Sequence, residues 1–244
     1  MAEQLYTIPV NDAFDADCEC PICRMYEDLQ NNAIEFVMGT SYMEDDVRME
    51  TDEIGFCDKH IPLLYKNQNR LGLGLMMLTH MDKTMKEMEK KMKQKVSAPS
   101  LFKKNVSASS AVKAYSDKLD QSCYVCRRFN HMFDRYVATT LWLYNRDEGF
   151  RKKFSSCKGF CTRHYALLYE LAPSEINSKL LDEFINALNK VYMENFKRVR
   201  DDLEWFTDKF DYRYADAPWK NSRDALIRAV QKTNSVFVEE KKNK

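Results

Sequence analysis

A pattern of cysteines and histidines occurs twice in this chain and indicates how it folds. It reads CPIC at residues 20–23 and GFCDKH at residues 55–60, then CYVC at residues 123–126 and GFCTRH at residues 159–164. The flanks match as well, since Arg24 corresponds to Arg127 and the LLY at 63–65 corresponds to the LLY at 167–169. One CxxC can arise by chance, but two matching units at a similar separation indicate an internal repeat.

The spacing within each unit is typical of a zinc site. A tetrahedral Zn²⁺ takes four ligands at ~2.0–2.3 Å, and a CxxC or CxxH step lets two side chains of one turn reach the same ion. We therefore expect two ions, each held within one copy of the pattern. The predicted Cys3His ligand sets are Cys20, Cys23, Cys57 and His60, followed by Cys123, Cys126, Cys161 and His164. Spacing alone leaves open a swapped arrangement, in which the CxxC of one copy meets the CxxH of the other.

Four protein ligands fill a tetrahedral ion, so the metal is expected to be structural and not catalytic. Soft thiolates also suit an iron–sulfur cluster, which is one alternative, and a thiol-redox or metal-sensing role for the same cysteines is another. Cys18 and Cys157 have no counterpart in the other copy. We interpret them as buried or free thiols, with a role as accessory thiols as the alternative.

Composition indicates an all-α fold. The 244 residues include only six Gly and six Pro, while residues with good helix propensity are abundant. The balance of 38 basic and 37 acidic residues gives a net charge of +1 and selects no partner by charge. The N-terminal residues resemble no signal peptide, and no apolar run is long enough to span a membrane. We therefore expect a cytoplasmic protein without membrane contact.

Apolar periodicity predicts helices after each motif. Each CxxC is expected to open a helix, and another helix should follow each GFCxxH. A seam at steps of three and four residues comprises Leu78, Met81, Met85, Met88 and Met92, and a second one comprises Ile185, Leu188, Tyr192, Phe196, Val199, Leu203, Phe206 and Phe210. We expect paired antiparallel helices from the two halves to bury both seams. The alternative for the Met-rich seam is an adaptable partner-binding surface.

The predicted organisation is two zinc-tied helical subdomains packed as an internal duplication. The first spans 1–93, a Ser-rich linker spans 94–111, the second subdomain spans 112–215, and a C-terminal amphipathic segment with a polar tail spans 216–244. Lysines concentrated over 83–104 suggest nucleic-acid binding as a further alternative. His80 and His131 lie outside both ligand sets and are expected to be structural.

No hydrolytic or phosphate-binding signature is present, which favours a binding or adaptor module with a protein partner over an enzyme. The stretches YTIPVNDAF, CECPIC and SYMEDDVR and the twin GFCxxH motifs resemble an uncharacterised bacterial family of cysteine-rich helical proteins, described only as a domain of unknown function. The resemblance covers most of the chain and implies bacterial, cytoplasmic origin and metal binding. One departure lies within the chain itself: Pro21 follows the first cysteine of one CxxC, and Tyr124 follows that of the other.

Overall fold

The computed structural model describes residues 6–93 and 110–238. In these residues the fold is all-α, as composition predicts, and no strand occurs. The α-helices are α1 (Thr7–Asp15), α2 (Pro21–Met38), α3 (Asp45–Ile54), α4 (Ile61–Lys66), α5 (Arg70–Met92), α6 (Ala111–Asp120), α7 (Tyr124–Arg146), α8 (Glu148–Ser156), α9 (Thr162–Glu175), α10 (Leu181–Asp208) and α11 (Ala225–Asn234). Two 3₁₀ turns, η2 (Ser41–Met43) and η3 (Tyr212–Tyr214), complete the order. No helix among the described residues is long and apolar enough to cross a membrane.

The helix starts follow the cysteine motifs. Both α2 and α7 begin at the residue directly after the first cysteine of a CxxC, and the side chain of Cys161 caps α9 by accepting from the backbone N–H of His164. The predictions that each CxxC opens a helix and that another helix follows each GFCxxH are therefore confirmed. Most of the predicted linker, 94–109, lies outside the described residues.

The chain divides into two compact units, and the segment that forms the second is inserted between the two segments that form the first. Unit 1 comprises residues 1–28 and 133–244, and unit 2 comprises residues 29–132. The boundaries fall inside α2 and α7. This differs from the predicted consecutive domains 1–93 and 112–215, because the N-terminal helix and the first CxxC join the C-terminal half.

Aromatic packing explains why the N-terminus belongs to unit 1. Phe14 of α1 packs its ring edge-on against Phe150 of α8, with the ring centroids 4.9 Å apart. The same ring also contacts Phe154 and Phe160, which are fully buried. Burial of such a cluster is a major source of stability. Phe160 belongs to the second GFCxxH motif, so this cluster brings that motif next to the N-terminal segment.

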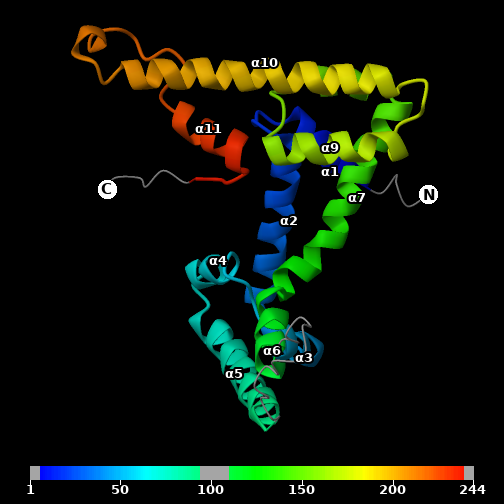
Figure 1. Ribbon diagram of the computed structural model, residues 1–244, viewed down its shortest axis with the longest axis vertical. Helices are drawn as coiled ribbons and strands as arrows, with labels where there is room; N and C mark the ends of the chain where they lie inside the picture. Colours follow the sequence, from blue (N-terminus) through cyan, green and yellow to red (C-terminus); the bar gives the residue numbers. More distant parts are fainter. Residues whose placement is uncertain (1–5, 94–109, 239–244) are drawn as a thin grey trace, which may run out of the picture. The chain divides into compact units, whose positions relative to one another are not determined.

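Helix α10 organises the rest of unit 1. It contacts α8, α9 and α11, and Figure 1 shows α9 and α11 beside it. The inward side chains Phe184, Leu188, Val191 and Val199 are buried. Of the predicted seam on this helix, Leu188 and Val199 are buried, Phe210 beyond its end is 76% exposed, and the other members are half-buried. The predicted seam is therefore only partly buried.

Unit 2 does not bury the Met-rich seam, so the prediction that both seams are buried is wrong. Leu78, Met81, Met85 and Met92 are 57–69% exposed in α5, and the remaining seam residue, Met88, is half-buried. Gly72, Leu73 and Met76 are the buried residues of this helix, which contacts α3, α4, α6 and η2. The short neighbours α3 and α6 cover one side of α5, and its seam faces away from the core.

Candidate metal centres

All eight predicted ligands gather in two clusters, but the pairs are exchanged between the two copies. Site 1 consists of Cys20, Cys23, Cys161 and His164, and site 2 consists of Cys57, His60, Cys123 and Cys126. Within each cluster the ligand atoms lie within 4.8 Å of one another. The predicted ligand sets within one copy are therefore wrong, and the swapped arrangement is the one that the fold builds.

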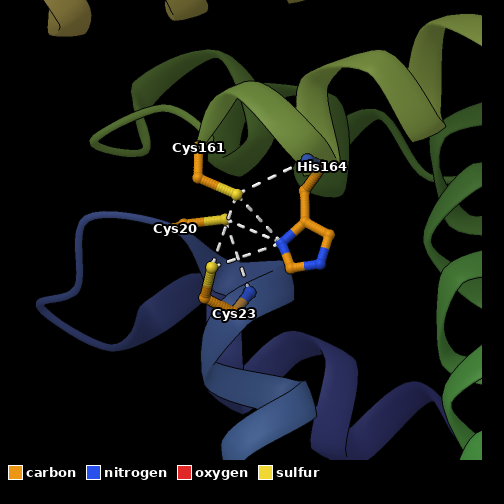
Figure 2. Close-up of side chains that lie close together, drawn as sticks. All are labelled: Cys20, Cys23, Cys161 and His164. Atoms are coloured by element: carbon orange, nitrogen blue, oxygen red, sulfur yellow. Dashed lines mark hydrogen bonds between the residues drawn. The ribbon is translucent and has the colours of Figure 1, made fainter. Parts of the chain in front are cut away.

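Site 1 is built from the starts of two helices. Cys20 and Cys23 flank the first turn of α2, while Cys161 and His164 flank the first turn of α9. Figure 2 shows the three sulfurs and the imidazole ring pointing toward one another from these two elements. All four side chains are buried. The positive end of a helix dipole favours thiolate, so both helix starts support metal ligation.

The geometry of site 1 fits a tetrahedral ion. Zinc with bonds of ~2.3 Å to sulfur and ~2.05 Å to nitrogen places two sulfurs about 3.8 Å apart, and a sulfur about 3.5 Å from the nitrogen. In site 1 the sulfurs of Cys23 and Cys161 are 3.5 Å apart. The Nδ1 of His164 lies 3.2 Å from each of these sulfurs and 3.6 Å from that of Cys20. An ion therefore fits among these atoms with little rearrangement.

Site 2 has the same chemistry and more exposure. His60 Nδ1 lies 3.2 Å from the sulfur of Cys57, 3.4 Å from that of Cys123 and 3.3 Å from that of Cys126. The other ring nitrogen, Nε2, lies 3.2 Å from Oε1 of Gln30, which fixes the ring with Nδ1 toward the sulfurs. Cys57 and Cys126 are half-buried, in contrast to the buried ligands of site 1.

The pKa values of the thiols would favour a bound cation in each cluster. Hydrogen bonds with Cys20 and Cys23 lower the pKa of Cys161, while hydrogen bonds with Cys161 and Cys20 together with burial raise the pKa of Cys23. In site 2 a hydrogen bond from Cys126 lowers the pKa of Cys123 to about 3, while the pKa of Cys126 is raised. Without metal, one thiolate in each cluster is therefore favoured at the expense of a neighbouring thiol. A divalent cation stabilises all three thiolates at once.

The two accessory cysteines lie outside both clusters of the described residues. Burial raises the pKa of Cys18, and it raises that of Cys157 to about 11. The sulfur of Cys18 donates a hydrogen bond to the carbonyl of Ala13. High pKa values make both thiols poor nucleophiles at neutral pH.

The Lys-rich region, His80 and His131 belong to neither cluster. Within the Lys-rich region, Lys83 pairs with Glu53 at 3.0 Å and Lys90 pairs with Glu87 at 2.7 Å. Lys95, Lys103 and Lys104 of that region lie outside the described residues. His80 is a structural contact of unit 2, since its Nδ1 lies 2.8 Å from the carbonyl of Asp52. His131 is exposed.

Sequence reasoning missed the residues that support site 1 from the C-terminus. Lys232 is 1% exposed, and its ammonium donates to the carbonyl of Glu19, the residue before the ligand Cys20. The hydroxyl of Ser235 donates to the sulfur of Cys161 over 3.0 Å. The sequence identified this segment only as amphipathic, and nothing local connects it to residues 19 and 161.

Comparison with known proteins places the chain in a family without assigning it an activity. No curated protein and no solved structure matches it. A family model matches residues 1–240, which is nearly the whole chain. The chain therefore belongs to the family described as "Family of unknown function (DUF6062)".

Proposed function

We propose that this protein binds two zinc ions in closed Cys3His sites, one within each unit, where each ion holds the helices of its own unit together. The observation that carries the proposal is the convergence of three sulfurs and one Nδ1 in each cluster, at separations that match a tetrahedral ion. Four protein ligands leave no position open for water or substrate, which favours a structural ion over a catalytic one. Thiolate-rich sites with one histidine suit zinc in particular.

Elemental analysis and native mass spectrometry of anaerobically purified protein test this proposal. About two zinc ions for each chain, lost together with helicity on chelation, support it. Iron with acid-labile sulfide would favour the iron–sulfur alternative. A metal-free, folded chain with readily alkylated thiols would favour thiol-redox chemistry and overturn the zinc proposal.

A binding role for a protein partner is the second part of the proposal. The exposed seam of Leu78, Met81, Met85 and Met92 supports it, because apolar residues at this spacing pack against a second helix with a seam of its own. The simplest partner is a second copy of the chain. Sedimentation of the zinc-loaded protein tests this case: a dimer that Met81→Glu/Met85→Glu abolishes supports it, and a monomer at all concentrations excludes it.

Nucleic-acid binding has less support than binding to a protein partner. Three lysines of the basic region, Lys83, Lys90 and Lys91, are paired with glutamates on the same unit, which reduces the charge available to phosphates. An affinity for duplex DNA that falls steeply as the salt concentration rises would support nucleic-acid binding.

A further inference from the structure

In site 2 the two ligand loops are joined directly to each other. The hydroxyl of Ser122 donates to the carbonyl of Ile54 over 2.7 Å, and the backbone N–H of Tyr124 donates to the carbonyl of Gly55 over 3.0 Å. Ser122 and Tyr124 flank the ligand Cys123, while Ile54 and Gly55 come shortly before the ligand Cys57. These two bonds hold the CxxC loop against the CxxH loop.

The sequence of site 1 cannot form either bond. Pro21 stands where site 2 has Tyr124, and proline has no backbone N–H. Glu19 stands where site 2 has Ser122, and an ionised carboxylate accepts hydrogen bonds but does not donate them. The two ligand loops of site 1 therefore need a donor from elsewhere.

Lys232 of α11 supplies that donor. Its ammonium donates to the carbonyl of Glu19 in one ligand loop and to the carbonyl of Lys158 in the other. It also pairs with the carboxylate of Glu19 at 3.1 Å, so all three of its protons have an acceptor. Lys158 occupies the position that Ile54 has in site 2. A single buried ammonium from the C-terminal helix thus joins the loops that two local bonds join in site 2.

We propose that Lys232 is a positioning residue of site 1, so that the affinity of this site for metal depends on docking of the C-terminal helix. This inference rests on the proposed metal binding. Lys232 is not one of the four ligands of site 1. It fixes the spacing between the pair at residues 20 and 23 and the pair at residues 161 and 164. Outer-shell partners of this kind are typically worth about 10- to 100-fold in metal affinity.

Two further contacts tie the end of α11 to the same site. Ser235 has left-handed backbone geometry, with φ 58°, and its hydroxyl donates to the sulfur of the ligand Cys161. The hydroxyl of Thr162 donates to the carbonyl of Lys232 over 3.2 Å. A hydroxyl bond to sulfur is stronger when the sulfur is a thiolate, which is its state when metal is bound.

This arrangement requires glycine at position 159, because a side chain there would collide with its neighbours. Gly159 has φ +88°, and a Cβ there would lie 2.9 Å from the Cβ of Asn195, 3.0 Å from the carbonyl oxygen of Val191 and 3.3 Å from the Nζ of Lys232. Gly55, the matching glycine of site 2, instead faces the ring of His80. The same motif is thus supported by α5 in unit 2 and by α10 and α11 in unit 1.

Linkage makes the dependence reciprocal. If docked α11 favours metal in site 1, then metal in site 1 favours docked α11 by the same factor. Loss of this metal is expected to loosen residues 225–235, which also contact α9 and α10 and whose other anchors include the buried Ala225 and the ion pair of Arg228 with Asp202 at 2.9 Å. The C-terminal helix would then report the metal state of site 1.

The test replaces Lys232 by methionine in the full, metal-loaded chain and follows metal release to a chelator. The expected result is release from site 1 that is about 10- to 100-fold faster, with site 2 unchanged. Lys209→Met is the matched control. Lys209 is also buried in unit 1, and its ammonium donates to three carbonyls, but those belong to Tyr214, Ala215 and Ala217, away from the site.

A compensating variant separates positioning from general stability. In Glu19→Ser/Lys232→Met the new hydroxyl can donate to the carbonyl of Lys158, as Ser122 does to Ile54 in site 2. We expect slower release from site 1 than in Lys232→Met alone. The spectrum of Co²⁺ in site 1, which senses ligand geometry, should likewise change in the single variant and move back toward that of the parent in the double variant.

Hydrogen exchange measures the reciprocal effect and remains decisive if Lys232→Met folds poorly. Cys20→Ser disables site 1 and Cys123→Ser disables site 2, and exchange in residues 225–235 should rise only in the first. Equal exchange in both variants, or equal site 1 release in Lys232→Met and Lys209→Met, would overturn the inference while leaving metal binding intact. A parent chain without metal would instead overturn the proposed function.

Discussion

The sulfur of Cys23 lies 3.2 Å from Nδ1 of His164, although 141 residues separate the two in sequence. This contact joins the first motif of the N-terminal copy to the last motif of the C-terminal copy. The internal repeat of the sequence is therefore not two independent zinc modules in a row. Each site needs ligands from both copies.

The exchanged ligand sets predict an unusual pattern of metal loss in serine variants. Cys23→Ser and Cys161→Ser each remove a ligand of site 1, so the double variant should still bind one zinc ion. Cys23→Ser/Cys57→Ser removes one ligand from each site and should bind none. Native mass spectrometry counts the ions. The reverse result, with no ion in the first double variant and one ion in the second, would support ligand sets within each copy.

Removal of metal should destabilise the chain strongly. An ion present at about a thousand times its dissociation constant stabilises the folded state by about 4 kcal/mol at each site. For a chain of this length, 1 kcal/mol shifts the melting temperature by about 2–4 °C. Chelation should therefore lower the melting temperature by more than about 10 °C and reduce helicity, as followed by circular dichroism. An unchanged melting curve would contradict a structural role for the metal.

The two ions should leave at different rates. Cys57 and Cys126 of site 2 are half-buried, whereas the ligands of site 1 are buried, so a chelator reaches site 2 more readily. Competition with a coloured chelator should show a fast and a slow phase of equal amplitude. Cys123→Ser should remove the fast phase, and Cys20→Ser should remove the slow one. A single phase in the parent would count against the difference in access.

Cys157 should resist alkylation in the folded protein. Burial raises its pKa to about 11, so at pH 8 only about one thiol in a thousand is ionised. Its reaction with iodoacetamide should be about two orders of magnitude slower than that of an exposed cysteine, and it should accelerate as the pH rises toward 11. Mass spectrometry after trypsin digestion locates the modified residue, and urea-unfolded protein serves as the reactive control. Rapid labelling of folded, metal-loaded protein would favour thiol chemistry.

The eight candidate ligands and the local structure around them follow from the sequence alone. CxxC and CxxH steps place two ligands on one helical turn wherever that turn lies in the fold, so the pairs at 20 and 23, 57 and 60, 123 and 126, and 161 and 164 depend on neighbours in sequence alone. Low glycine and proline content and apolar periodicity likewise indicated an all-α chain with helices starting at the motifs.

Which pairs meet, and what surrounds them, depends on the tertiary fold. Spacing says nothing about contacts between residues far apart in sequence; the burial of Phe14 against Phe160 brings the N-terminal CxxC to the C-terminal CxxH. The exposed seam of α5 shows the same limit, because periodicity identifies an apolar face but not a neighbour that covers it. Lys232 is the clearest case. In sequence it is one lysine among many, and its role arises because folding buries its ammonium between the carbonyls of Glu19 and Lys158.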